Sequence, residues 1–286
     1  MKELLEMIRK DNMRIYGITE VRKGVKETVY PNDYELHDSI ATVRNIYSVS
    51  KAFTMAAVGF CFDDGLLKPS DSLGRIFGKL PQSASAGWAD VNVDNLLRHE
   101  TGCRRGDDLD ASNLRDFTDG DWMEYILRKP IEEEPGKTER YSDINFFLLS
   151  CIVTKLTGMS MLDYMRQKFF NPTAFREVAW SADPEGRNLG GTALYISTDD
   201  MVKLGQLWLQ RGMWNGRRLV SVKWIDLSLE RSYAFSCRSR KAGTFYKTGM
   251  LGQILIFSYR DDYVLGVEAY SRQTGKLVDA AFPDAD

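Results

Sequence analysis

The sequence has few of the residues on which many enzymes depend for proton transfer. It contains only two histidines, His37 and His99. A Ser-His-Asp hydrolase would have to use one of them, and the Gly-x-Ser-x-Gly turn that carries the serine in α/β-hydrolases is absent. If the chain is a serine enzyme, lysine and tyrosine are therefore the expected proton carriers.

Cysteine is also scarce, and its distribution predicts no metal site. The four cysteines are widely separated, and no Cys-x-x-Cys pair occurs. Cys61 and Cys151 fall in apolar helical runs that are typical of a protein core. Asp107, Asp108 and Asp110 lie close together, but the spacing of an EF-hand calcium loop does not follow. We therefore expect no metal ion.

Excess charge and long apolar runs are missing as well. The formal net charge of −2 on 286 residues gives no electrostatic argument for a nucleic-acid partner or an anionic membrane. No apolar run approaches the length of a membrane span. The first ten residues indicate a short amphipathic helix of mixed charge rather than a signal peptide, so a cytoplasmic location is expected for the chain as given.

Hydrophobic periodicity predicts strands towards both ends of the chain and helices between them. Alternation over 13–30 predicts a β-hairpin that turns at Lys23-Gly24, followed by a short strand near 40–47. Long aromatic and β-branched runs predict strands over Thr244–Tyr259 and Tyr263–Tyr270. Helices are predicted at 48–64, 93–98, 121–128, 145–156, 162–170 and 199–211.

This order of elements predicts an α/β (α+β) fold. We expect an antiparallel sheet built from both chain ends and flanked by helices, with an all-α lobe inserted between its halves. The expected boundaries are 1–65 with 180–286 for the sheet-containing domain, and 66–179 for the mostly helical one. A cleft between two such lobes would be a natural place for a small-molecule site.

A serine and a lysine begin the most apolar of the predicted helices. Ser48 lies at or just before its N-terminus, and Lys51 follows one turn later on the same face. Because this helix is apolar all round, we expect it to be buried and Lys51 to be partly desolvated. Such a lysine can activate a neighbouring hydroxyl as a nucleophile. The alternative is an N-cap serine followed by a surface lysine.

Two later segments carry groups that suit the same chemistry. Tyr141 stands where a loop enters an apolar helix, and beside a lysine its phenol can pass protons. Lys247 and Thr248 begin a strand and could hold a substrate carboxylate, while Gly249 leaves room for another backbone. The N–H of Met250, with that of the serine, would form an oxyanion hole. A half-buried tyrosine and a strand-edge lysine are the alternatives.

Taken together, the ordered motifs resemble the serine β-lactamase and penicillin-binding protein superfamily, and most closely its class C β-lactamase-like branch. The resemblance covers nearly the whole chain. Its segments are Ser48-Val49-Ser50-Lys51, Leu96-Leu97-Arg98-His99-Glu100-Thr101-Gly102, Tyr141-Ser142-Asp143, Gly190-Gly191 with Ser197-Thr198-Asp199-Asp200-Met201, and Lys247-Thr248-Gly249.

The resemblance implies an α/β domain with an all-α domain and no cofactor. It implies that Ser48 becomes acylated and that Lys51 and Tyr141 handle protons. Lys247 would assist at a substrate carboxylate, and the N–H groups of Ser48 and Met250 would bind the oxyanion. A small-molecule substrate follows from such a site.

The resemblance also assigns residues around the catalytic group. His99 would be structural, while Asp143, Thr248 and Gly249 would lie at the substrate. Class C enzymes carry asparagine at the position of Asp143, where it helps to bind the substrate amide. The aspartate predicts weak β-lactam recognition. The chain is also shorter than full-size class C enzymes, so elements that enclose the pocket are expected to be missing. Class C enzymes are exported, whereas no export signal is expected for the chain as given.

Three functional hypotheses therefore stand. The first is a serine hydrolase that forms an acyl-serine intermediate on small esters, amides or D-amino-acid peptides. The second is a true β-lactamase or a D-Ala carboxypeptidase. The third is a catalytically silent protein that senses a ligand in the cleft, against which the presence of Ser48, Lys51, Tyr141 and Lys247 argues.

Overall fold

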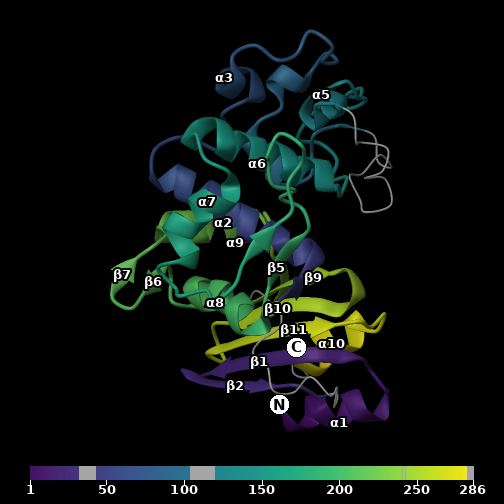
Figure 1. The fold of residues 1–286 in the computed structure, drawn as a ribbon, viewed down its shortest axis with the longest axis vertical. Helices are drawn as coiled ribbons and strands as arrows, with labels where there is room; N and C mark the ends of the chain where they lie inside the picture. The colour runs from purple at the N-terminus through teal and green to yellow at the C-terminus, as the bar shows by residue number, and fades with distance from the viewer. Residues whose placement is uncertain (32–42, 104–119, 240, 242, 282–286) are drawn as a thin grey trace.

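The two ends of the chain meet in one six-stranded antiparallel sheet, with the strand order β2-β1-β11-β10-β9-β8. In the computed structural model, which describes residues 1–31, 43–103, 120–239, 241 and 243–281, the N-terminal strands lie beside the C-terminal ones (Figure 1). The strands are β1 (Ile15–Arg22), β2 (Val25–Val29), β8 (Ser236–Ser239), β9 (Thr244–Gly249), β10 (Gln253–Ser258) and β11 (Tyr263–Ala269). The predicted fold class is confirmed.

Two hairpins of the sheet turn at residues with positive φ. β1 and β2 join through Lys23 and Gly24, with φ of 49° and 77°, as the alternating pattern predicted. The single strand predicted over Thr244–Tyr259 is wrong. A 3₁₀ turn at Met250–Gly252, in which Leu251 has φ 63°, divides it into the antiparallel pair β9 and β10. Gly249 and Gly252, which flank this reversal, were the available signal for it.

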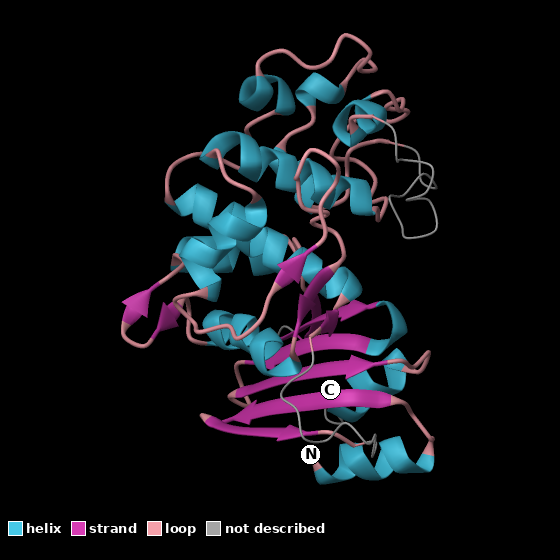
Figure 2. Ribbon diagram, viewed as in Figure 1, coloured by secondary structure: helices cyan, strands magenta, loops and turns pink. Residues whose placement is uncertain are grey.

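Helices cover both faces of the sheet (Figure 2). On one face α8 (Thr198–Leu209) packs against β1, β10 and β11. On the other face α1 (Lys2–Lys10) and α10 (Thr274–Ala281) close a second apolar cluster, which includes Leu4, Ile8 and Leu277. Successive residues of a strand point to opposite faces, so β10 and β11 supply both clusters.

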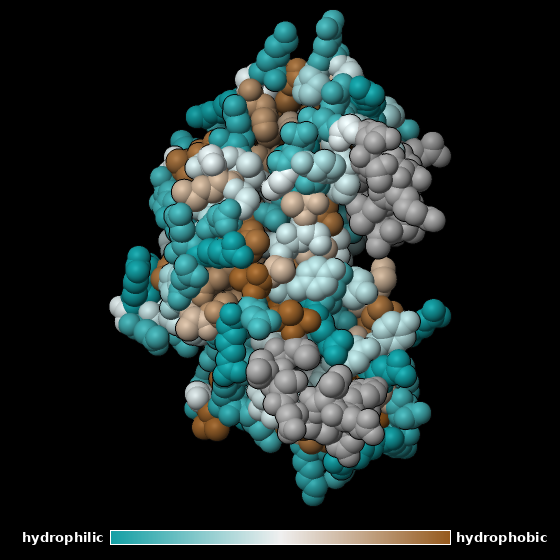
Figure 3. Space-filling model, viewed as in Figure 1, coloured by the Kyte–Doolittle hydropathy of each residue, from teal (hydrophilic) through white to brown (hydrophobic). Residues whose placement is uncertain are grey.

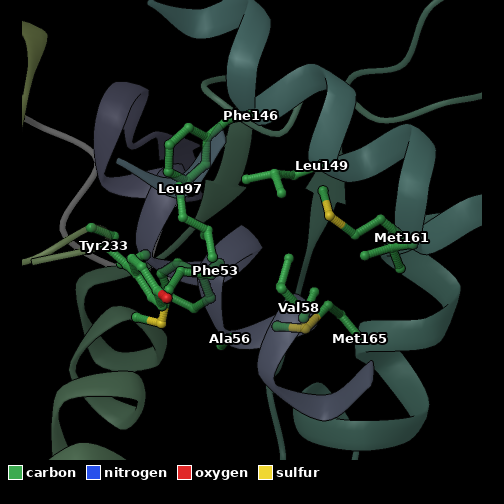
Figure 4. Close-up of a cluster of buried hydrophobic side chains, with 14 of the residues drawn as sticks. Phe53, Ala56, Val58, Leu97, Phe146, Leu149, Met161, Met165 and Tyr233 are labelled. Carbon is green, nitrogen blue, oxygen red and sulfur yellow. The ribbon is translucent and has the colours of Figure 1, made fainter. Parts of the chain in front are cut away.

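The helix α2 (Ser50–Asp63) is the centre of the main core. Every residue from Ser50 to Cys61 is buried, as the all-round apolar pattern predicted. A Cβ on Gly59 would lie 2.2 Å from the ring of Trp224, so α9 (Val222–Glu230) packs closely here. Here side chains of α2 meet those of α4 (Val93–Leu97), α6 (Asp143–Thr157) and α7 (Met161–Met165). Figure 4 shows Phe53, Val58, Leu97, Phe146, Leu149, Met161 and Met165 in this core.

The helical part of the molecule follows the predicted pattern with small shifts in its boundaries. The observed helices are α3 (Leu73–Phe77), α4 (Val93–Leu97), α5 (Trp122–Leu127), α6 (Asp143–Thr157) and α7 (Met161–Met165), which continues as a π-helix (Arg166–Phe170). The helices α3, α9 and α10 were not predicted. The domain boundaries stay a prediction, because the main core cluster contains residues from both predicted parts.

Two smaller sheets complete the described chain. A three-stranded sheet has the order β3 (Arg44–Asn45), β5 (Leu194–Ile196) and β4 (Ala179–Trp180). Of the strand predicted near 40–47, the structure describes residues 43–47, and only Arg44–Asn45 form a strand. β6 (Met213–Trp214) and β7 (Arg217–Arg218) form a hairpin.

The surface is mostly polar. The face in Figure 3 is largely hydrophilic, with scattered apolar patches. Across the described residues, no single helix is long and apolar enough to cross a membrane. Only α6 joined to Met161–Phe170 reaches that length, and this pair is bent by 72°.

Candidate active site

Ser48 is held in a tight turn at the start of the central helix. It lies in a 3₁₀ turn (Tyr47–Val49) that leads directly into α2. Ser48 therefore lies just before the helix and not in its first turn. Tyr47 has a φ of 46°, a left-handed conformation that is unfavourable for a bulky residue. Its N–H donates to Asn45 Oδ1 at 2.8 Å, which helps to hold the turn.

Lys51 is fully buried beside the serine. Its Nζ donates to Ser48 Oγ at 3.3 Å and to the carbonyl oxygen of Gly191 at 3.0 Å. It also forms an ion pair with Asp143, from the first turn of α6. The alternative of a surface lysine is thus wrong. Asp143 and Gly191, from segments far from Lys51 in the sequence, hold its amine beside the Ser48 hydroxyl.

Tyr141 and Lys247 complete the cluster. The Tyr141 ring centroid lies 4.6 Å from Lys51 Nζ and 5.1 Å from Lys247 Nζ, so the phenol stands between two amines. Burial, reinforced by the charge of Lys51, lowers the pKa of Lys247 to about 7. This lysine therefore changes its charge near neutral pH.

The ring of His99 packs against the ring of Tyr141. Their ring centroids are 4.6 Å apart, and the His99 ring also lies 5.1 Å from that of Phe146. His99 Nδ1 accepts from the Ser142 N–H at 3.3 Å and lies 3.1 Å from the Asn145 amide nitrogen. Burial, followed by the charges of the two lysines, lowers the pKa of His99 well below its usual value. Its contacts are those of a neutral, structural residue.

Gly249, the last residue of β9, lies against the backbone of the turn that holds Ser48. A Cβ at this position would lie 2.6 Å from the carbonyl oxygen of Ile46 and 3.1 Å from the nitrogen of Ser48. Only glycine therefore allows the strand to come this close to the serine turn. The arrangement brings the segment that contains Met250 to the Ser48 backbone, as an oxyanion hole made of their two N–H groups requires.

Two pockets adjoin this cluster. One has a volume of about 690 Å³, reaches the cluster through His99, and is lined by charges of both signs: Arg98, Arg231, Arg238, Glu100, Glu139 and Glu230. The other has a volume of about 290 Å³ and reaches the cluster through Tyr47 and Leu251. Ser48 lines neither pocket, but its chain neighbour Tyr47 lines the smaller one.

The structure brings most of the predicted site residues together. Ser48, Lys51, Tyr141 and Lys247 form one cluster, and Thr248 and Gly249 continue the strand from Lys247. Sequence reasoning placed Asp143 at the substrate and missed its ion pair with Lys51.

The part played by Gly190-Gly191 was only partly foreseen. The resemblance picked out this pair of glycines, but not that the carbonyl oxygen of Gly191 would accept from Lys51. A Cβ on Gly191 would lie 2.8 Å from Asp143 Oδ1. The paired glycines were the available signal for so close an approach.

Metal coordination finds no support in the described part of the chain, where no group of three or more histidine, cysteine, aspartate or glutamate side chains is placed to hold an ion. Asp107, Asp108 and Asp110 lie outside the described residues. Cys61 and Cys151 are free and buried, as expected of core residues.

Residues 20–282 match the family described as Beta-lactamase. The chain belongs to the β-lactamase family of serine hydrolases. Its fold is that of a class C β-lactamase from Rhodobacter sphaeroides, with a TM-score of 0.72 and 16% identity over 99% of this chain and 97% of the other. It also matches a structure titled "Putative 6-aminohexanoate-dimer hydrolase from Bacillus anthracis", with a TM-score of 0.82 and 15% identity over 98% and 80% of the two chains.

The curated relatives that this chain matches are longer than it is. A protein of Escherichia coli O157:H7 named "Putative D-alanyl-D-alanine carboxypeptidase" is 23% identical over 83% of this chain and 56% of its own length. A protein of the same name from Escherichia coli K12 is 25% identical over 57% of this chain and 41% of its own length. The chain therefore spans about half the length of these relatives.

The contacts of His99 predict a loss of stability when it is truncated. His99→Ala should lower the free energy of unfolding by about 2 kcal/mol, because the Ser142 N–H and the Asn145 amide lose their acceptor. His99→Asn, which keeps an acceptor and tolerates the φ of 59°, should recover part of this loss. Chemical denaturation measures both. If His99→Asn instead removed a kinetic pKa near 6.5, His99 would be a general base.

The low pKa of Lys247 predicts a pH-dependent affinity for carboxylate-bearing substrates. Below about pH 7 the amine is protonated and attracts a carboxylate, and this attraction is lost as the pH rises through 7. KM should therefore increase several-fold between pH 6.5 and pH 8.5. With Lys247→Arg, which stays charged, KM should stay level over this range. An equal increase in the arginine variant, or with a neutral ester, would contradict the assignment.

Proposed function

We propose that this protein is a serine hydrolase that forms an acyl-serine intermediate on small esters, amides or D-amino-acid peptides. The observation that carries the proposal is the position of Lys51. Its buried amine reaches both Ser48 Oγ and Asp143, next to the ring of Tyr141. A buried amine held against a serine hydroxyl suits the activation of a nucleophile better than it suits structural support.

The reaction follows from this geometry. Ser48 Oγ attacks the substrate carbonyl, and its proton passes to the Lys51–Tyr141 pair. The N–H groups of Ser48 and Met250 stabilise the oxyanion. The carbonyl re-forms as the bond to the leaving group breaks, and the leaving group takes up the proton. A water molecule then attacks the Ser48 ester by the same route and releases the acid.

The substrate class follows from the charges around the cluster. Lys247 offers a cation for a carboxylate, and the larger pocket carries both arginines and glutamates. Such a lining suits a zwitterionic or peptide-like substrate. The name of the Escherichia coli O157:H7 relative supports a D-Ala carboxypeptidase as the second candidate.

We further propose that β-lactams are poor substrates. Asp143 occupies the position at which class C enzymes carry an asparagine, and its Oδ1 is paired with Lys51. A carboxylate accepts hydrogen bonds but does not donate them, so it cannot reproduce both contacts of an amide side chain.

The decisive experiment follows the intact mass of the protein over time with a penicillin and with 4-nitrophenyl acetate. The proposal predicts an acetyl adduct on the wild type and none on Ser48→Ala, with slow or absent penicilloylation. A long-lived penicilloyl adduct would favour the carboxypeptidase, and rapid penicillin turnover would favour a true β-lactamase. Absence of any adduct, together with saturable ligand binding, would favour the silent sensor.

A further inference from the structure

The smaller pocket has a lining unlike that of the larger one. It has a volume of about 290 Å³, and its walls include four tyrosines, Tyr16, Tyr47, Tyr195 and Tyr270, together with Arg44 and Gln253. The guanidinium carbon of Arg44 lies 3.8 Å from the centroid of the Tyr16 ring. A cavity of this size with aromatic walls and a few polar groups suits a small planar molecule.

Polar atoms of this region lack partners. Arg44 and Gln253 line the pocket, and one buried atom of each, Arg44 Nε and Gln253 Oε1, has no hydrogen-bond partner. Gln253 is 3% exposed, and its amide nitrogen is already bound to the carbonyl oxygen of Ala269 at 2.7 Å. The side-chain oxygen is therefore left as an acceptor. A buried acceptor and a buried cationic donor that are both unsatisfied are costly unless a ligand or water completes them.

Arg44 supplies the positive charge of this pocket. Glu268, which is 2% exposed, lies close enough for Arg44 to affect its pKa, which burial raises well above the usual value. Among the described residues that line the pocket, Arg44 alone carries a formal charge. The pocket thus favours an anion, and its aromatic walls favour a flat ring.

The pocket also contacts two turns near Ser48, the turn Tyr47–Val49 and the turn Met250–Gly252. Tyr47 and Leu251 line it, with φ of 46° and 63°, and both are strained for residues of their kind. Tyr47 immediately precedes Ser48, and Leu251 immediately follows Met250. Each strained residue is therefore bonded to one of the residues whose N–H groups form the proposed oxyanion hole.

We propose that this tyrosine-lined pocket binds a small aromatic carboxylate that also carries a hydrogen-bond donor, and that its occupant stabilises the oxyanion hole through Tyr47 and Leu251. The carboxylate would bind Arg44, and the donor would bind Gln253 Oε1. The effect on catalysis rests on the proposed function. Binding itself does not.

Binding can be tested without turnover. We would titrate the Ser48→Ala variant of this chain with 4-hydroxybenzoate, using calorimetry and ligand-observed NMR. Saturable binding is expected, weakened at least tenfold by Arg44→Gln and by replacing the probe with neutral 4-hydroxybenzyl alcohol. Arg217→Gln removes an exposed arginine from the β6–β7 hairpin and should leave the affinity unchanged. No saturable binding, or equal binding to Arg44→Gln, would overturn the proposal.

The coupling to catalysis needs the active protein. With saturating 4-hydroxybenzoate, the acylation rate constant of Ser48 by 4-nitrophenyl acetate should rise at least threefold in the wild type and stay unchanged in Arg44→Gln. An increase in KM alone would mean that the probe competes for the substrate site, which would contradict a separate pocket. Binding without a change in rate would overturn the coupling. Failure of the acylation itself would refute the proposed function and leave the binding result intact.

Discussion

Replacement of Lys51 by methionine is expected to lower the rate of Ser48 acylation by about 10⁴-fold, which corresponds to about 5.5 kcal/mol in activation free energy. Methionine has a similar length and is apolar, so the packing of α2 should persist. The variant loses the amine that contacts Ser48 Oγ and Gly191. Both the path for the serine proton and the positioning of the hydroxyl are then lost. Single-turnover acylation with 4-nitrophenyl acetate measures the effect.

The same replacement has a cost in stability that must be separated from chemistry. Lys51→Met leaves Asp143 without its ion-pair partner. Lys203→Met is a matched control, because Lys203 pairs with Asp200, which is 1% exposed, on α8. It should lower stability and retain acylation. If Lys51→Met acylated within tenfold of the wild-type rate, Lys51 would not be the activating group.

Replacement of Gly249 by alanine is expected to lower kcat/KM by about 10²- to 10³-fold, the usual effect of losing one oxyanion-hole donor. The new Cβ would lie 2.6 Å from the carbonyl oxygen of Ile46, a distance that real Cβ atoms do not adopt. β9 or the serine turn must therefore move, and the N–H of Met250 would move with it. Steady-state kinetics measures the effect, and thermal unfolding should show a loss of about 1–3 kcal/mol.

Two other glycines provide controls for this change. A Cβ on Gly205 would lie 2.6 Å from Val264 Cγ1, in the packing of α8 on the sheet and away from the serine. Gly205→Ala should therefore lower stability and leave the kcat/KM of the folded protein near the wild-type value. A Cβ on Gly275, in α10, would meet nothing within 4 Å, so Gly275→Ala should change neither the stability nor kcat/KM. Unaltered kcat/KM in Gly249→Ala would argue against an oxyanion hole at this strand end.

The sequence predicted those elements whose pattern is local. The hairpin at Lys23-Gly24 and the buried helix after Ser48 were both found from periodicity and turn residues. The reversal at Leu251 was missed although Gly252, with a φ of 95°, stands beside it, because Gly249 was interpreted only as room for another backbone. The helices α3, α9 and α10 were missed for a different reason, since each depends more on packing than on a long periodic run.

The residues of the candidate site could be predicted from the sequence, but the contacts between them could not. Motif order identified Ser48, Lys51, Tyr141 and Lys247, whereas the ion pair between Lys51 and Asp143 joins residues 92 positions apart. No local pattern reports such a contact. The stacking of His99 on Tyr141 is of the same kind. Long-range pairings are set by the tertiary fold, and single-sequence reasoning reaches them only through a resemblance.

The sheet built from both chain ends has a consequence for the order in which the protein becomes active during synthesis. Ser48 and Lys51 leave the ribosome well before β10 and β11, which hold β9 in register with β1. A nascent chain that ends before β10 would carry Ser48 without a paired strand to complete the proposed oxyanion hole. The protein should therefore be chemically silent until β10 and β11 have been synthesised.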